Sequence, residues 1–307
     1  MELRIFTEPQ LGTTYEQLRR HALTAEQLGF DGWFTSDHLL TMGDRGPEPG
    51  PTDAWTTLAG LARDTTRIRL GTLVTPATFR WPGHFAVQAA QVDQMSGGRI
   101  EIGLGSGWFE QEHDAMGIPF PDTADRVDAR DEYVEILHGL WSTPFGERFS
   151  YDGQHFTLTD NPALPRPTQE PHPPLIIGGG GRVRTPAIAA RFADEYNGVF
   201  FEPGEFAEMA AIVREACEDI GRDPADLVWS NAQRCVVGAD EDEYVRRAEA
   251  IGSDPAKLRD GGVCGTPDEA RERLDDLAAA GCERVYLQTI DVTDLEHLEL
   301  LATELLD

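Results

Sequence analysis

Residues 68–103 read IRLGTLVTPATFRWPGHFAVQAAQVDQMSGGRIEIG and contain one complete strand–helix–strand unit. The apolar run over 68–74 is typical of a buried strand, and the amphipathic stretch over 85–95 predicts a helix. The glycine pair at 97–98 ends that helix and leads into a second strand over 99–103. Two strands joined through a helix lie parallel in one sheet, so this stretch indicates an α/β fold.

The same alternation runs along the whole chain and predicts eight strand–helix units. The expected strands cover residues 3–6, 32–35, 68–74, 99–103, 175–177, 198–201, 227–237 and 284–287. Eight such units in 307 residues favour a closed (β/α)8 TIM barrel. The alternative is an open Rossmann-like sheet, but no G-x-G-x-x-G follows the first strand. We expect one domain over residues 1–307.

Two segments depart from this regular alternation. A loop rich in glycine and proline is expected over 43–51, after the second strand. An insertion between units four and five covers residues 143–174 and contains seven prolines. Within it, the Asp152-Gly153 pair is typical of a hairpin turn.

Composition and charge disfavour several classes of function. The 26 basic and 54 acidic residues give a net charge of −28, which would repel a nucleic acid over most of the surface. Lys257 is the single lysine, which disfavours Schiff-base and P-loop chemistry. No apolar run is long enough to span a bilayer, and the chain does not start with a signal-peptide pattern. We therefore expect a cytoplasmic protein without a membrane partner.

The cysteines and histidines do not form a metal-binding pattern. No C-x-x-C pair occurs, and no two histidines have metal-ligand spacing with a third partner. The cysteines are therefore predicted to be buried free thiols, and no metal site is expected. They lie far apart along the chain, at Cys217, Cys235, Cys264 and Cys282.

In a TIM barrel the chemistry takes place at the carboxyl ends of the strands. His38 follows the second expected strand, and its imidazole can donate or accept a proton near neutral pH. The neighbouring Asp37 can accept a hydrogen bond from a polar ligand. The alternative is that His38 only satisfies a loop carbonyl.

Two glycine-rich stretches follow other strands. Gly178-Gly-Gly-Gly181 precedes a predicted helix, so its backbone could approach an anion closely, with Arg182 and Arg184 beside it. Gly103-Leu-Gly-Ser-Gly107 could let a flat ring lie against the backbone, next to Trp108. A plain tight turn and close strand–helix packing are the respective alternatives.

Taken together, these stretches resemble the bacterial luciferase-like monooxygenase superfamily, in particular its branch that uses the deazaflavin coenzyme F420. The resemblance covers nearly the whole chain in order. It is carried by residues 25–38 (AEQLGFDGWFTSDH), 70–76 (LGTLVTP), 96–108 (SGGRIEIGLGSGW), 173–181 (PPLIIGGGG), 265–267 (GTP) and 285–287 (VYL).

The resemblance implies a barrel with deazaflavin or FMN at the carboxyl-end rim. It implies that Asp37 contacts the cofactor and that His38 handles a proton near the reacting ring. It further implies a non-proline cis peptide between Leu73 and Val74, forming a bulge that backs the ring.

The remaining cofactor-binding residues implied are Ser106, Gly107, Trp108, Gly178, Gly179, Gly180, Gly181 and Arg182. Sugar-phosphate dehydrogenases of this branch carry an acidic residue where this chain has Trp108. Glu110 is the possible replacement for that acid. This difference indicates another small-molecule substrate.

The resemblance therefore predicts an F420-dependent oxidoreductase that transfers a hydride between the coenzyme and a small organic substrate. The alternative is an FMN-dependent monooxygenase that uses O₂ and receives reduced flavin from a partner reductase. A third possibility is a flavin- or deazaflavin-binding protein without catalysis. The family resemblance also implies a homodimer.

Overall fold

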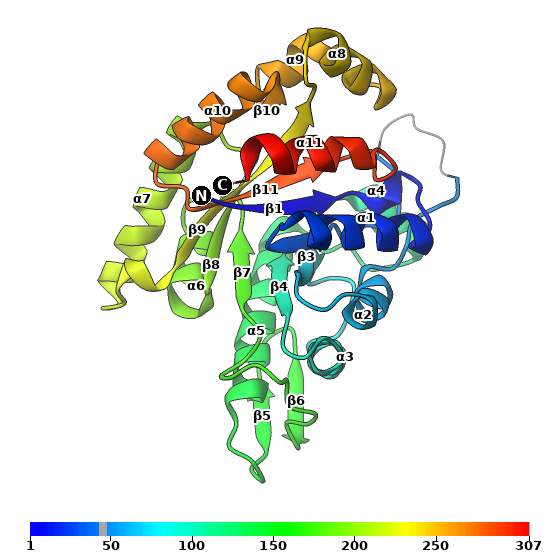
Figure 1. Cartoon of the computed structure of the whole chain (residues 1–307). Helices are drawn as coiled ribbons and strands as arrows, with labels where there is room; N and C mark the ends of the chain where they lie inside the picture. Colours follow the sequence, from blue (N-terminus) through cyan, green and yellow to red (C-terminus); the bar gives the residue numbers. More distant parts are fainter. Residues whose placement is uncertain (43–47, 307) are drawn as a thin grey trace.

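The computed structural model describes residues 1–42 and 48–306, so most of the predicted 43–51 loop lies outside the described residues. Eight parallel strands form a closed barrel, as predicted (Figure 1). The barrel closes because β9 pairs with both β8 and β11, while β1 pairs with β11 and β2. The barrel strands are β1 (Glu2–Thr7), β2 (Gly32–Thr35), β3 (Arg69–Pro76), β4 (Ile100–Gly105), β7 (Leu175–Gly178), β8 (Glu195–Val199), β9 (Val228–Val237) and β11 (Arg284–Thr289).

Helices surround the barrel, and local sequence signals set their ends. Thr14 and Gln17 form a capping box at the start of α1, and Gly29 ends this helix in a left-handed conformation with φ 103°. Asp53 caps α2 through the amide of Thr56. The surrounding helices are α1 (Tyr15–Leu28), α2 (Ala54–Asp64), α3 (Pro82–Ser96), α5 (Thr123–Ser142), α6 (Arg184–Phe192), α7 (Pro203–Asp219), α8 (Glu241–Ala250), α10 (Pro267–Ala279) and α11 (Leu295–Leu305).

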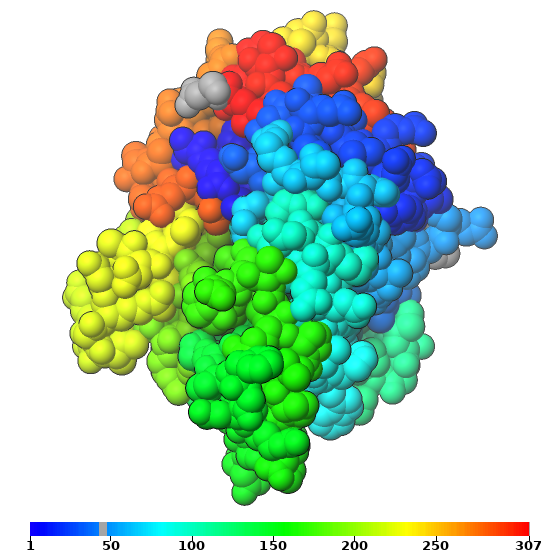
Figure 2. All heavy atoms as spheres, turned by 60° about the horizontal axis from the view of Figure 1, so that its bottom comes forward, coloured from blue at the N-terminus to red at the C-terminus, as the bar shows by residue number. Residues whose placement is uncertain are grey.

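The insertion between units four and five contains the expected hairpin, β5 (Phe149–Asp152) and β6 (Thr157–Asn161), which pair antiparallel. This hairpin extends from the barrel body at the bottom of Figure 1. In Figure 2 the same green segment forms a protruding part of the surface. The insertion is therefore an appendage of the barrel and adds no strand to it.

The sixth expected strand was placed incorrectly. We predicted it over 198–201, but β8 covers Glu195–Val199. Its polar residues Glu195 and Asn197 face the barrel interior, where Arg284 and Ser230 bind them. The apolar signal at 199–201 thus belongs largely to the turn that follows the strand.

Several short elements were also not predicted. They are η1 (Pro9–Leu11), α4 (Glu110–Met116), η2 (Pro224–Asp226), α9 (Pro255–Arg259) and β10 (Gly262–Gly265). β10 pairs with the last residues of β9, beyond the region where β9 pairs with β8. Among the described residues, no helix has the length and apolar character needed to cross a membrane. All four cysteines are buried and free.

Of the three apolar clusters among the described residues, two pack against the two faces of the barrel strands. The larger lies between the outer face of the strands and the helices and includes Ile5, Trp33 and Phe85. The smaller contains Phe6, Phe34, Leu73, Ile176, Ala232 and Tyr286, which fill the barrel interior. The filled interior leaves chemistry to the two ends of the barrel.

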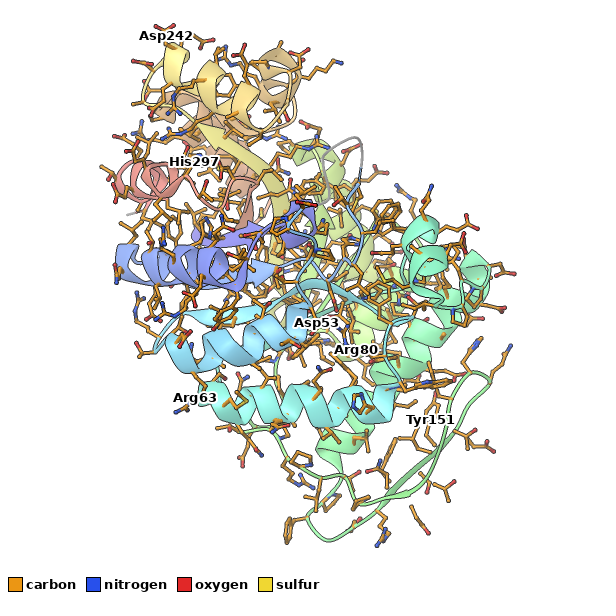
Figure 3. All side chains as sticks on the ribbon, turned by 90° about the vertical axis from the view of Figure 1, so that its right-hand side faces the viewer. Asp53, Arg63, Arg80, Tyr151, Asp242 and His297 are labelled. Carbon is orange, nitrogen blue, oxygen red and sulfur yellow. The ribbon has the colours of Figure 1, made fainter. Side chains whose placement is uncertain are left out.

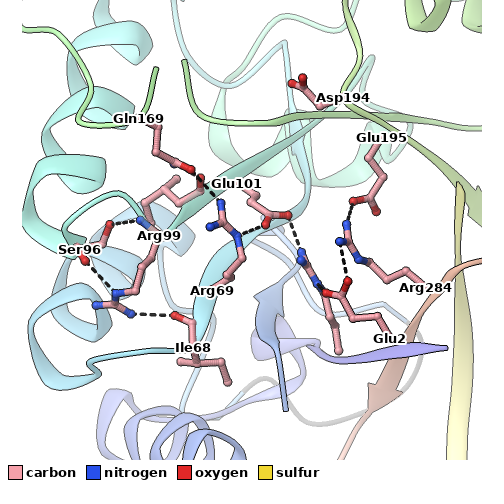
Figure 4. Close-up of polar contacts among 12 residues, drawn as sticks. Glu2, Ile68, Arg69, Ser96, Arg99, Glu101, Gln169, Asp194, Glu195 and Arg284 are labelled. Atoms are coloured by element: carbon pink, nitrogen blue, oxygen red, sulfur yellow. Dashed lines mark hydrogen bonds and ion pairs between the residues drawn. The ribbon is translucent and has the colours of Figure 1, made fainter. Parts of the chain in front are cut away.

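The amino end of the barrel is closed by a network of charges (Figure 4). Glu101 pairs with both Arg4 and Arg69. Arg284 pairs with Glu195 and, at 2.7 Å, with Glu2. Charged groups are costly to bury unless they are paired, and these pairings compensate that cost.

Candidate active site

The carboxyl ends of the barrel strands, here called the mouth, carry a histidine–carboxylate pair. His38 follows β2, and its Nδ1 lies 2.8 Å from Oε1 of Glu112 on α4. The other oxygen of Glu112 accepts the amide of Leu39 at 3.0 Å, so both carboxylate oxygens are engaged. The side chain of Glu112 is only 1% exposed. This arrangement fixes the ring of His38 and leaves its Nε2 without a partner among the described residues.

The surroundings of His38 favour its charged form. Burial lowers the pKa of its imidazole, but the hydrogen bond and charge of Glu112 outweigh that effect, with smaller help from Glu8 and Asp37. The pKa of His38 is therefore raised above its ordinary value. Trp108 lies edge-on to His38, with ring centroids 5.8 Å apart, and 64% of this tryptophan is exposed. His38 thus has a charged partner on one side and an exposed aromatic ring on another.

Asp37 belongs to a second ion pair. Its fully buried carboxylate binds Arg80 at 2.5 Å and accepts the hydroxyl of Thr75 at 2.9 Å. Arg80 also binds Asp53 at 2.7 Å, and Figure 3 shows these two residues side by side. Protein groups therefore already bind the Asp37 carboxylate, and its direct contact with a cofactor stays a prediction.

The peptide between Leu73 and Val74 is cis, as the resemblance implies. At the same place the pairing of β3 with β4 shifts register, between Thr72 and Thr75, which confirms the expected bulge. A Cβ atom at Gly105 would lie only 2.7 Å from a methyl group of Val74. This glycine is therefore needed for close packing at the bulge.

Gly107 has a φ of 78°, and a Cβ there would lie 2.8 Å from the hydroxyl of Thr78. Its carbonyl accepts the Nε of Arg126 at 3.3 Å. The neighbouring Ser106 is partly exposed at the mouth. Within residues 103–107, Gly105 is therefore required for close packing, whereas the backbone at 106–107 is accessible to a ligand.

The tetraglycine stretch leads from β7 toward α6. A Cβ at Gly178 would collide with the Asn197 carbonyl at 2.6 Å, whereas Gly179, with φ 121°, has nothing within 4 Å. The amides of Gly180, Gly181 and Arg182 have no acceptor among the described residues. Open backbone with free N–H groups fits an anionic group of a cofactor.

The arginines beside this stretch already have acidic partners. Arg182 binds Glu208 at 2.6 Å on the surface, and Arg184 binds Asp131 at 2.8 Å. An anion at the glycines would therefore compete with Glu208 for Arg182. The role of Arg182 in cofactor binding stays a prediction.

The carboxylate that binds His38 is Glu112, which was not among the predicted site residues. Glu110, which was offered for the acid role, is exposed in the first turn of α4 and has no hydrogen bond to His38 among the described residues, and its role stays a prediction. Glu112, two residues later, lies on the buried face of the same helix. The only sequence signal was the EQEH stretch at 110–113, and it became informative only once α4 placed Glu112 toward His38.

Comparison with known proteins identifies the family. The family model described as luciferase-like monooxygenase matches residues 1–260. The chain belongs to the luciferase-like monooxygenase family. It is 33% identical over 255 residues to pyrimidine monooxygenase RutA of Klebsiella pneumoniae. That match covers 78% of this chain and 65% of the relative, so the chain spans less than two thirds of its length.

Solved structures share the fold over nearly the whole luciferase-like chain. The monooxygenase RslO1 from Streptomyces bottropensis has a TM-score of 0.83 at 24% identity, covering 100% of this chain and 99% of that one. An F420-dependent secondary alcohol dehydrogenase has a TM-score of 0.85 at 20% identity, covering 99% of this chain and 98% of that one. The 3,6-diketocamphane monooxygenase from the CAM plasmid of Pseudomonas putida, solved with FMN, has a TM-score of 0.79 at 18% identity. That match covers 99% of this chain and 97% of the other. Proteins of this fold therefore bind either cofactor.

Proposed function

We propose that this luciferase-like protein is an F420-dependent oxidoreductase that transfers a hydride between the deazaflavin and a small organic substrate. The observation that carries the proposal is the His38–Glu112 pair at the mouth. When bound, the deazaflavin would supply or accept the hydride. The protein would position the reactants and handle the proton.

His38 suits the proton step for two reasons. A hydride added to a carbonyl carbon leaves negative charge on oxygen, which a nearby acid must neutralise. Because Nδ1 faces Glu112, the free Nε2 is the atom that can give this proton to the substrate. The raised pKa keeps the imidazole charged to higher pH than an ordinary histidine.

The residues proposed to hold the cofactor line the same end of the barrel. The cis peptide at Leu73–Val74 would back the ring, while Ser106, Gly107 and Trp108 would flank it. The free amides at Gly180 and Gly181 would bind its phosphate.

Titration of the purified protein with F420 and with FMN tests the cofactor. We expect saturable binding of F420, followed by absorbance, with FMN binding at least about tenfold more weakly, a difference of about 1.4 kcal/mol. Micromolar binding of FMN without binding of F420 would overturn the proposal.

A second candidate is a monooxygenase that uses O₂ and reduced FMN from a partner reductase. The 33% identity to pyrimidine monooxygenases favours it. It predicts O₂ consumption and an oxygenated product only when reduced FMN is supplied. If F420 supports turnover under anaerobic conditions, this candidate is excluded as the main activity.

The proposal also includes a cytoplasmic location, a homodimer, one domain over residues 1–307 and no nucleic-acid partner. Sedimentation equilibrium tests the dimer, and a single cooperative unfolding transition tests the single domain. A monomer at micromolar concentration would contradict the dimer without affecting the proposed chemistry.

A further inference from the structure

We infer that Arg234 is an anion-binding residue of the mouth and that the substrate carries a carboxylate or phosphate group. The assignment of this anion to the substrate rests on the proposed function. The presence of an anion-binding group at Arg234 rests on the geometry of β8 and β9 alone.

Arg234 projects from the inner face of the barrel at its carboxyl end. Side chains alternate along a strand, so Ala232 and Arg234 share one face of β9. Ala232 belongs to the interior cluster, which places Arg234 one layer nearer the mouth. Unlike Ala232, Arg234 is exposed.

This guanidinium has no acidic partner. No carboxylate of residues 1–42 or 48–306 comes within ion-pair distance of Arg234, although the chain contains 54 acidic residues. By contrast, Arg273 on the nearby α10 binds Glu202 with two hydrogen bonds, of 2.7 and 2.9 Å. In a protein of charge −28, a cation left unpaired at the mouth is available to a ligand.

Glu8, the acid that follows β1, is already bound by side-chain amides. Gln288 of β11 pairs in register with Arg234. Its side-chain amide donates to Glu8 at 2.6 Å, and Gln10 donates to the other oxygen of Glu8. Both carboxylate oxygens of Glu8 therefore accept hydrogen bonds without Arg234.

Arg234 rests on a rigid aromatic platform. Its Cζ lies 5.3 Å from the centroid of the Phe200 ring. Phe200 has a φ of 54°, a conformation that non-glycine residues rarely adopt and that occurs often at ligand sites.

Hydrogen bonds hold this turn in place. Phe200 N–H donates to Ala232 O at 3.1 Å. The side-chain amides of Asn231 and Gln233 each donate to Phe201 O at 2.9 Å. A guanidinium held over an immobilised ring can bind an anion with little loss of conformational freedom.

The position of Arg234 relative to His38 indicates how a substrate would lie. Around the barrel, two strands, β1 and β11, lie between β2 and β9 in the shorter direction. The two residues therefore stand on different walls of the same mouth. A substrate could place its reacting carbon near His38 while Arg234 binds its anionic group.

The experiment measures binding of benzoate and phenyl phosphate to the protein without cofactor by calorimetry, with benzyl alcohol as the uncharged probe. The variant is Arg234→Gln. The matched control is Arg214→Gln, because Arg214 also stacks on a ring, that of Trp229 at 4.3 Å, but lies on α7 outside the barrel. We expect at least one anion to bind saturably, and Arg234→Gln to weaken it about tenfold or more. Arg214→Gln should bind as the unsubstituted protein does.

Equal binding of the anions by Arg234→Gln, or no saturable anion binding by the unsubstituted protein, overturns the assignment. A second titration compares F420 affinity between the same proteins. If Arg234→Gln loses F420 affinity and keeps anion binding, the residue serves the cofactor and the substrate assignment is wrong. Because the first measurement uses no cofactor, failure of the proposed F420 chemistry does not change its outcome.

Discussion

The two ends of the barrel use charge in opposite ways. At the amino end, Arg4, Arg69 and Arg284 are matched by Glu2, Glu101 and Glu195, within a depression of about 590 Å³. At the mouth, the Nε2 of His38 and the guanidinium of Arg234 have no hydrogen-bond or ion-pair partner among the described residues.

This difference separates stability from function. Paired charges at the amino end cost free energy when one partner is removed. Unpaired groups at the mouth can instead act on a ligand, in the end of the barrel where TIM-barrel enzymes carry their active sites. The depression at the amino end therefore contains structural ion pairs, and the free groups at the mouth are available for chemistry.

Removing His38 should produce the largest effect on activity. His38→Ala should lower kcat by about 10²–10⁴-fold, the usual contribution of a general acid, while thermal unfolding changes little. His84→Ala, on the exposed face of α3, is the control and should retain full turnover. Full turnover by His38→Ala would contradict the assignment of the chemistry to the unpaired groups of the mouth.

Breaking the charge network at the amino end should instead reduce stability and leave catalysis unchanged. Glu101→Ala leaves Arg4 and Arg69 without their shared partner and should reduce the free energy of unfolding by about 3–5 kcal/mol. Substrate KM should not change at a temperature where the variant is folded. Urea unfolding measures the loss, with the exposed Glu215→Ala as the control. A loss below about 1 kcal/mol would show that this network is not a stabilising feature.

Glu112 should act through His38. The hydrogen bond to Glu112 and its charge raise the pKa of His38, so Glu112→Gln should lower that pKa, because only the smaller effects of Glu8 and Asp37 then oppose burial. The protonated, active fraction would be lost at lower pH, and the alkaline limb of kcat/KM should move to lower pH. We also expect kcat to fall about tenfold or more, as for other carboxylates that orient a catalytic histidine.

The matched control is Glu110→Gln, a change two residues away on the same helix at an exposed position. Its pH profile should coincide with that of the unsubstituted protein. Identical profiles for all three proteins would mean that Glu112 is only a structural residue.

The smallest effect is expected at the surface ion pair near the tetraglycine stretch. Arg182→Gln breaks an exposed pair with Glu208, and such pairs contribute little to stability, so Tm should not change measurably. The Kd of F420 should rise about fivefold to tenfold if the guanidinium also binds the phosphate. An unchanged Kd would leave phosphate binding to the backbone amides alone.

Local signals predicted much of the fold. Seven of the eight barrel strands overlap their predicted ranges closely, because each carries an apolar run bounded by turn residues. The sixth predicted strand was misplaced because Glu195 and Asn197 are polar residues within β8. Their burial is compensated by partners on β9 and β11. Such partners are distant in sequence and leave no local pattern.

The sequence predicted the mouth in outline, and the tertiary structure added residues that the sequence had not indicated. His38, the Leu73–Val74 peptide and the tetraglycine stretch all lie at the ends of barrel strands, where their positions in the chain placed them. Glu112 and Arg234 were missed because the first depends on a short unpredicted helix and the second on the absence of a partner.

The amino-acid sequence by itself determined the barrel, its helix caps and the residues that follow each strand, since these depend on periodicity and on local backbone chemistry. Only the tertiary structure decided which charges are neutralised and which stay free. An ion pair depends on distances between residues such as Arg4 and Glu101, 97 positions apart in the chain. Folding alone brings such groups together, so it alone separates the paired amino end from the reactive mouth.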